Sequence, residues 1–267
     1  MLRRVSFAVA VGLLLATPYG ARAEDLTLEQ IIDKYIKAHG GRDKIDAIQS
    51  VRVTGKQKMS GGMDIEVPVV MEQQRPNKFR VDFTFQGLTG TRAFDGKTGW
   101  SIMPFQGKTD AEKMSEDDVK EVEDEADLAG PLIDSQAKGH KVELVGKEDA
   151  EGEQAYKVKV TKKNGNIEYH FVDAEQFLTI KSSGVRKVQG SEMEYEAIYG
   201  DYKSVDGWLM PHTLEQRAMG MKMMFVFDKV ETNVKLPADR FTMPEPKKEQ
   251  PKKEEPKKEG EKKDPGK

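Results

Sequence analysis

The stretch Phe79-Arg80-Val81-Asp82-Phe83-Thr84-Phe85-Gln86 alternates apolar and polar residues without interruption. Successive side chains of a β-strand point to opposite faces, so this pattern predicts a strand with one buried and one wet face. Residues 65–71 repeat the pattern one strand earlier, although Pro68 lacks an N–H group and indicates a sheet edge there. Burial of one face only is typical of antiparallel sheets.

Further strand-like runs lie on both sides of this stretch and are separated by short turn-forming segments. Ser60-Gly61-Gly62, Asp95-Gly96, Asn164-Gly165 and Asp206-Gly207 have the residues that hairpin turns prefer. Because strand follows strand through tight turns, the pattern predicts an antiparallel meander and argues against parallel βαβ units. The further strands are expected at residues 92–94, 99–103, 141–146, 155–161, 167–172, 178–188, 192–202, 209–216 and 221–234.

Three helices are expected beside the strands. Residues 27–39 form an apolar stripe at helical spacing, with Thr27 and Gln30 placed as a capping box. A second, short helix is expected at 43–48. Residues 105–139 interrupt the strands with an acidic helix at 115–128, and an insertion of this length is usually functional or a lid. The apolar residues expected to form the lid are Val119, Val122, Leu128 and Leu132.

The balance of strands and helices decides the expected architecture. A sheet of roughly ten strands tends to curl, and its apolar face must be covered by something. Only a few short helices are available for this, so we expect a mainly β (α+β) fold: a curled antiparallel sheet that forms an incomplete barrel, with helices over its concave face. An apolar cavity should remain between them. Its expected lining is Val67, Val69, Met71, Phe79, Val81, Phe83, Phe85, Trp100, Met221, Met223, Phe225 and Phe227.

The first residues have the features of a secretory signal peptide. Arg3 and Arg4 precede an apolar run at 7–16, and Ala21-Arg22-Ala23 matches the small-x-small cleavage pattern. The run is too short for a helix across a ~30 Å hydrocarbon core, which takes ~20 residues. We therefore expect residues 1–23 to be removed after Ala23 and the mature protein to be exported from the cytoplasm.

The opposite end has a different composition from the body, which we expect to be one domain at 24–244. Residues 245–267 repeat a proline, lysine and glutamate pattern without any large apolar side chain. Such a segment cannot bury enough surface to offset its chain entropy, so it is expected to be disordered. It is either a solubilising tail or a tether to another envelope component.

Catalytic and metal-binding patterns are missing from the sequence. The chain has no cysteine and four histidines, which are dispersed and lack the H-E-x-x-H spacing of a zinc site. His39 is placed near a helix C-terminus, where a cation is favoured. The carboxylates at 116–125 lack the pattern of an EF-hand loop and fit a solvated helix face. We expect neither an enzyme nor a cofactor or metal. The formal net charge of −3 argues against a nucleic-acid partner.

Methionine is the unusual component, with 13 residues in the chain. Met221, Met223, Phe225 and Phe227 share one face of a single expected strand. This face is either ordinary core or an adaptable apolar lining, because flexible methionine side chains repack around ligands of different shape.

Three segments resemble a known family. Arg75-Pro76-Asn77-Lys78-Phe79 resembles an R-P-N-x-F motif at a strand start, and Asp95-Gly96-Lys97-Thr98-Gly99-Trp100 resembles a D-G-K-T-x-W hairpin. Asp239-Arg240-Phe241-Thr242-Met243-Pro244 resembles a closing F-x-F segment followed by proline. Their order over most of 24–244 is similar to that in the outer-membrane lipoprotein carriers (LolA-like) and lipoprotein-sorting proteins.

The resemblance implies a monomeric periplasmic carrier that moves the acyl chains of lipoproteins, or other lipids, toward the outer membrane, with transport partners at both membranes. It also implies that Arg75 bonds to lid carbonyls and favours closure of the cavity; a surface arginine at a strand edge is the alternative. Met243 replaces the second phenylalanine of the closing motif, and the acidic helix and charged tail depart from the short carriers. An envelope sensor or scaffold that binds a protein partner remains the second hypothesis.

Overall fold

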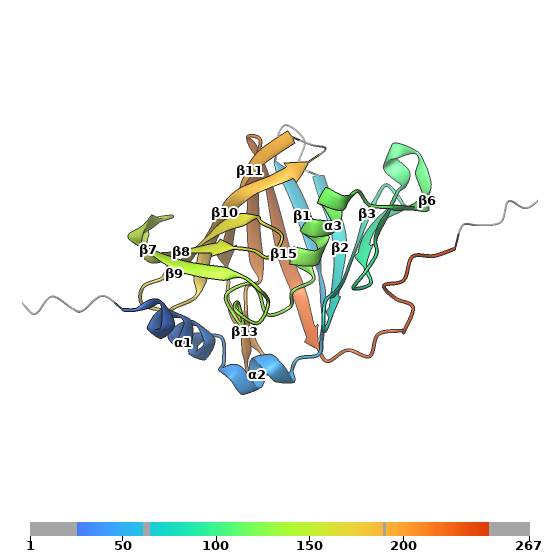
Figure 1. Ribbon diagram of the computed structural model, residues 1–267. Helices are drawn as coiled ribbons and strands as arrows, with labels where there is room; N and C mark the ends of the chain where they lie inside the picture. Colours follow the sequence, from blue (N-terminus) through green and yellow to red (C-terminus); the bar gives the residue numbers. More distant parts are fainter. Residues whose placement is uncertain (1–25, 61–64, 189–190, 246–267) are drawn as a thin grey trace, which may run out of the picture.

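The computed structural model describes residues 26–60, 65–188 and 191–245 (Figure 1). The expected signal peptide lies outside this range, as does the expected tail apart from its first residue, and the domain boundaries stay predictions. No helix in the described part of the chain is both long and apolar enough to cross a bilayer.

One large antiparallel sheet dominates the structure. Its thirteen strands are arranged in the order β6-β5-β4-β3-β2-β1-β15-β14-β11-β10-β9-β8-β7. A small second sheet pairs β12 (Lys203–Val205) with β13 (Trp208–Met210). The strands of the large sheet are β1 (Ser50–Ser60), β2 (Ile65–Gln74), β3 (Lys78–Phe85), β4 (Leu88–Phe94), β5 (Gly99–Met103), β6 (Lys108–Lys113), β7 (Lys141–Ala150), β8 (Glu153–Thr161), β9 (Ile167–Asp173), β10 (Thr179–Val188), β11 (Ser191–Gly200), β14 (Thr213–Ala218) and β15 (Met221–Thr232).

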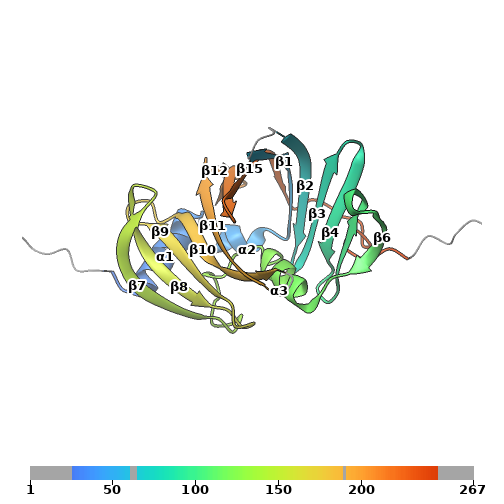
Figure 2. The ribbon, with the colours of Figure 1, turned by 90° about the horizontal axis from the view of Figure 1, so that it is seen from above.

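The sheet curls without closing. Figure 2 shows β7 and β6 at opposite ends of a curved wall, with the helices on its concave side. Two meanders build this wall, and the pairing of β1 with β15 joins them, with a register shift between Thr54 and Gly55. The expected incomplete barrel of antiparallel strands is confirmed.

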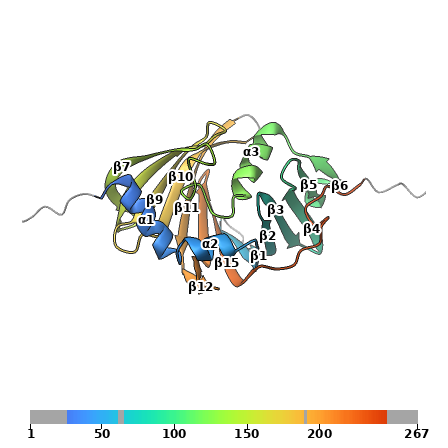
Figure 3. The same cartoon turned by 60° about the horizontal axis from the view of Figure 1, so that its bottom comes forward.

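Three α-helices cover the concave side: α1 (Leu28–Ala38), α2 (Arg42–Ala47) and α3 (Glu116–Glu125). Thr27 and Gln30 form the expected capping box at the start of α1. Ile31 and Tyr35 of α1 are buried in the main core cluster, so the apolar stripe faces the sheet. Figure 3 shows α1 on the side of β7–β10, α2 near the middle of the sheet by β15, and α3 between β10 and β3.

Some sequence-based expectations differ from the structure. The prediction that Pro68 marks an edge strand is wrong, because β2 pairs with both β1 and β3. Pro68 itself is paired only with β1, since the pairing of β2 with β3 begins at Val69. The strand expected at 209–216 is divided into β13 and β14. The break falls at Pro211-His212, where the His212 N–H bonds to the carbonyls of Gly200 and Asp201. β6 and β12 were not expected.

The convex face behind β2–β5 is covered by the C-terminal segment. Phe241 is 1% exposed, and its carbonyl accepts a 2.8 Å hydrogen bond from Nε1 of Trp100. Arg240 donates to buried Glu72 and, at 2.6 Å, to Asp82. Burial opposes ionisation of Asp82, but hydrogen bonds from Arg80 and Thr91 outweigh it and lower its pKa. These contacts hold the D-R-F-T-M-P segment at residues 239–244 against the outer face of the sheet.

Candidate functional site

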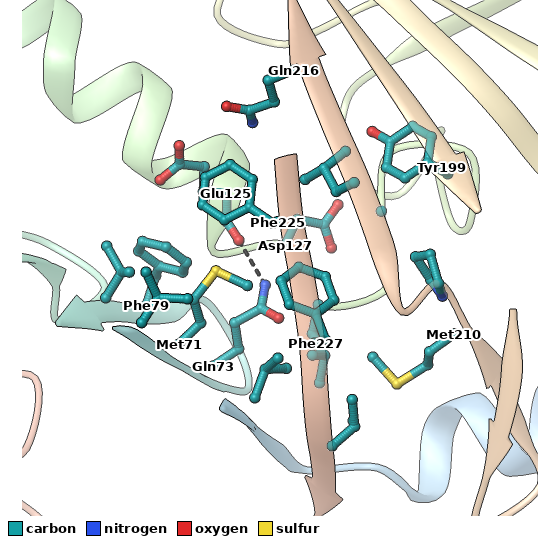
Figure 4. A pocket seen from close by; sticks show the side chains of 18 of the residues that line it. Met71, Gln73, Phe79, Glu125, Asp127, Tyr199, Met210, Gln216, Phe225 and Phe227 are labelled. Carbon is teal, nitrogen blue, oxygen red and sulfur yellow. Dashed lines mark hydrogen bonds between the residues drawn. The ribbon is translucent and has the colours of Figure 1, made fainter. Parts of the chain in front are cut away.

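A cavity of about 880 Å³ lies between the concave face of the sheet and the covering segments. This volume falls in the range of small-molecule binding sites, ~300–1,000 Å³. Apolar side chains of β2, β3 and β15 form one wall, and residues 128–133 after α3 face them. Figure 4 shows Met71, Phe79, Phe225 and Phe227 from these strands around the same space.

Strand periodicity explains how the lining arises. Alternate residues of β2 and β3 point to the concave face, and the register pairs Val69 with Phe83 and Met71 with Val81. All the residues expected to line the cavity border it except Trp100 and Met221; their role in binding a ligand stays a prediction. Those that border it are Val67, Val69, Met71, Phe79, Val81, Phe83, Phe85, Met223, Phe225 and Phe227.

Trp100 and Met221 lie elsewhere, and their placement in the lining is corrected. Trp100 is buried on the convex face beneath Phe241. Both faces of β5 are covered there, so an apolar residue does not reveal which face is the cavity side. Met221 is 58% exposed at the first position of β15, beside the hairpin that joins it to β14. The apolar face of β15 thus continues past the cavity.

The expected lid residues divide into two groups. Leu128 and Leu132 line the cavity. Val119 and Val122 do not border it, because the apolar side of α3 packs on Phe79 and Phe94 of the sheet. The apolar side of the helix therefore packs on the sheet beside the cavity, and the chain that follows the helix supplies the apolar part of the covering wall.

Arg75 forms hydrogen bonds to backbone carbonyls, but not to those of the insertion at 105–139. Its Nε donates to the carbonyl of Ile48 at 2.8 Å, and its Nη2 donates to that of Ile45 at 3.1 Å. Both acceptors lie at the end of α2, so the placement of Arg75 on the expected lid is corrected. That these two hydrogen bonds of Arg75 favour the closed cavity stays a prediction.

Sequence reasoning missed the charged part of the cavity wall. Arg92 of β4, Arg186 of β10, and Glu121 and Glu125 of α3 all line the cavity. Arg186 donates to Glu121, while Arg92 lies 3.5 Å from Glu125. The alternation of β4 places Arg92 on the same face as Phe94, so its position on the concave side could have been predicted. Its pairing with Glu125, and that of Arg186 with Glu121, joins residues that are distant in the sequence, and no local pattern predicts such pairs.

His39 was also missed as a lining residue. It is 7% exposed, and its Nδ1 is 2.9 Å from the carbonyl of Tyr35. Burial lowers the pKa of His39, and the hydrogen bond to Tyr35 opposes this only in part. The expected helix-terminal cation is therefore a neutral imidazole at neutral pH, with its Nδ1–H donating to the carbonyl.

Among the described residues, no group of three or more histidine or carboxylate side chains is arranged to hold a metal ion. The cavity wall combines a continuous apolar surface with the charged cluster and with scattered polar side chains such as Gln73, Asp127 and Tyr199. Apolar contact of this kind binds a hydrocarbon ligand without any fixed polar partner.

Comparisons with known proteins identify the class of fold. No family model matches the sequence, and no curated protein matches it. Solved structures show that the protein has a LolA-like fold.

Three of these structures have a TM-score of 0.56. An outer membrane lipoprotein-sorting protein domain from Vibrio parahaemolyticus is 10% identical, with 81% of this chain and 97% of that chain covered. A LolA superfamily protein from Nitrosomonas europaea is 14% identical, with 82% and 98% covered. A DUF1329 family protein from Desulfovibrio piger is 11% identical, with 80% and 96% covered. Identity this low shows the fold, and the ligand has to be argued from the cavity.

Proposed function

We propose that the protein is a periplasmic carrier that binds the acyl chains of lipoproteins or other lipids in its cavity and moves them toward the outer membrane. The observation that carries this proposal is the cavity of about 880 Å³, which the apolar side chains of β2, β3 and β15 line. A lipoprotein-sorting domain and a LolA superfamily protein with the same fold support it.

The energetics of hydrocarbon burial are sufficient for carriage. Each buried methylene contributes ~0.8 kcal/mol, so a dozen contribute roughly 10 kcal/mol before the costs of ordering ligand and protein are subtracted. Flexible methionine side chains, as at Met71 and Met223, adapt to chains of different length. A carrier has to release its cargo, and binding without fixed polar partners suits that need.

Location and partners follow from the same proposal. The pattern at residues 1–23 supports export, and a periplasmic monomer would receive its cargo at the inner membrane and deliver it at the outer membrane. The charged segment that begins at Glu245 is proposed to be either a solubilising tail or a tether.

A second candidate function is an envelope sensor or scaffold that binds a protein segment. The edge strand β7 favours it, because in the described structure β7 pairs with β8 alone and Val145 on it is 56% exposed. Unpaired strand edges bind extended peptides by strand addition.

Native mass spectrometry of the mature protein purified from its own periplasm tests the two functions against each other. We expect a mass above that of the chain by a lipid or an acylated peptide, and the delipidated protein serves as the reference. A bound protein partner without lipid would favour the sensor. Delipidated protein that takes up no acylated peptide would contradict the carrier.

A further inference from the structure

Arg92 of β4 is bonded differently from the other arginines in the described part of the chain. Each of the others donates a hydrogen bond to a carboxylate or a carbonyl. The Nη1 atom of Arg92 lies 3.5 Å from Glu125, and its Nη2 atom lies 3.9 Å from Glu121. Both distances exceed the ~2.7–3.2 Å of a direct N–H···O hydrogen bond. The two ion pairs therefore hold this guanidinium in place and leave its donors available to a closer acceptor.

Glu125, the last residue of α3, has a complementary deficit. Its Oε2 is buried and has no hydrogen-bond partner among the described residues. Burial raises the pKa of this carboxyl, and the charge of Arg92 opposes the rise only in part. The raised pKa favours the protonated form, which has an O–H donor of its own. Buried polar atoms in native structures normally have partners, so this one needs an explanation.

The position of Glu125 is fixed from several sides. Gln73 of β2 donates a 2.7 Å hydrogen bond to its carbonyl, as Figure 4 shows. Arg186 of β10 donates to Glu121 one turn earlier on α3, and the apolar side of the helix packs on the sheet. These contacts hold Glu125 and Arg92 side by side, so the arrangement exists before any ligand enters.

Arg92 and Glu125 both border the cavity, within its apolar wall. Arg92 is paired with Val81 across β3 and β4. On the same face of β3, Val81 is flanked by Phe79 and Phe83, which also line the cavity. Figure 2 shows α3 on the open side of the curled sheet, with β1 and β15 across the interior. The two polar side chains thus lie at the α3 end of a space that is otherwise largely lined by hydrocarbon.

The local charge favours an anion. With Glu125 protonated, the guanidinium groups of Arg92 and Arg186 face the single carboxylate of Glu121 within this charged cluster. One positive charge is then left without a counter-charge in a poorly solvated place, where a nearby anion is stabilised. A carboxylate suits the site best, because its two oxygens match the planar fork of an arginine.

We propose that Arg92 and Glu125 form a subsite for the carboxylate of a long-chain fatty acid, whose hydrocarbon chain extends along the apolar wall toward β1 and β15. This inference rests on the proposed carrier function, since it names a class of lipid that the cavity takes. The guanidinium of Arg92 donates to the carboxylate oxygens, and the O–H group of Glu125 donates to one of them. The subsite orients the lipid, while burial of the chain drives its entry.

Different head groups on one hydrocarbon chain test the subsite directly. Dodecanoate, methyl dodecanoate and 1-dodecanol are titrated separately into the delipidated mature protein by isothermal titration calorimetry. Dodecanoate is expected to bind about tenfold more tightly than the other two, the gain that a charge-assisted hydrogen bond supplies. Dodecanoate affinity no higher than that of the ester or the alcohol would overturn the subsite. Absence of binding by all three would instead overturn the carrier function itself.

Arg92→Met separates the subsite from the wall that binds the chain. Dodecanoate affinity is expected to fall at least about tenfold, because the anion loses its partner in a poorly solvated space, while 1-dodecanol affinity stays within about twofold. Arg217→Met is the matched control and should change neither affinity, since Arg217 pairs with Glu151 and Glu215 outside the cavity. Equal losses for both ligands in Arg92→Met, or an unchanged dodecanoate affinity, would contradict the subsite.

Glu125 provides a second test that leaves Arg92 intact. Glu125→Gln keeps the shape and a donor at the same position, so dodecanoate should bind as it does to the parent. Glu125→Leu removes the donor, and dodecanoate affinity should fall about fivefold or more, with 1-dodecanol affinity unchanged. Neither variant removes the backbone carbonyl that Gln73 contacts. Equal dodecanoate affinity in Glu125→Gln and Glu125→Leu would contradict the part that the Glu125 donor has in the subsite.

Discussion

Replacing Phe83 with glutamate is expected to abolish acyl-chain binding and leave the sheet folded. Phe83 lines the cavity, and its ring lies 5.7 Å from that of Phe105 between centroids. A carboxylate at this position would lose its hydration when a hydrocarbon chain entered beside it. Burial of an unpaired charge costs several kcal/mol, so the affinity should fall by more than about 100-fold, which corresponds to ~2.7 kcal/mol.

The control for this variant is the neighbouring residue. Thr84→Glu adds the same charge to the opposite face of β3, where Thr84 bonds to Thr89. Titration with a fluorescent fatty acid should show binding by this control and none by Phe83→Glu, while both retain the circular dichroism spectrum of the parent. Equal affinity in the two variants would show that the ligand binds elsewhere.

Phe241→Ala is expected to give the largest loss of stability, about 3–5 kcal/mol in the free energy of unfolding. The ring is 1% exposed, and the adjacent carbonyl accepts the indole N–H of Trp100. Removing the ring leaves a cavity and loosens the segment that carries Arg240, the partner of buried Glu72. Urea denaturation measures the change.

Thr242→Ala is the matched control, because Thr242 is exposed one residue further along the same segment. Its free energy of unfolding should change by no more than about 0.5 kcal/mol. Acyl-chain affinity should be preserved in folded Phe241→Ala, since the segment covers the convex face. Similar losses in both variants would contradict the role of the Phe241 ring.

Local patterns predicted most of the fold. The alternation in β3, the capping box of α1 and the turn glycines depend on neighbouring residues, so each is visible in one short window. The incomplete barrel followed from counting strands against helices. The pairing of β1 with β15 joins residues such as Val51 and Thr232, and no local pattern specifies such a contact.

The site was predictable where only one face of a strand was buried. Val81 and Phe83 lie in an alternating strand, and both border the cavity. The prediction that Trp100 lines the cavity was wrong, because the C-terminal segment buries the convex face of β5 as well and both faces of that strand are therefore apolar. The pairing of Glu121 with Arg186 was invisible for a different reason: the sequence shows that charges exist, but the curl of the sheet decides which of them meet.

The central claim is that hydrocarbon chains occupy the cavity, and a chain-length series tests it most directly. The delipidated mature protein is titrated with otherwise identical peptides that carry acyl chains of increasing length, and with the unacylated peptide. We expect no binding without the chain, and binding that strengthens by up to ~0.8 kcal/mol per added methylene until the cavity of about 880 Å³ is full. Affinity that is independent of chain length, or equal for the unacylated peptide, would contradict the claim.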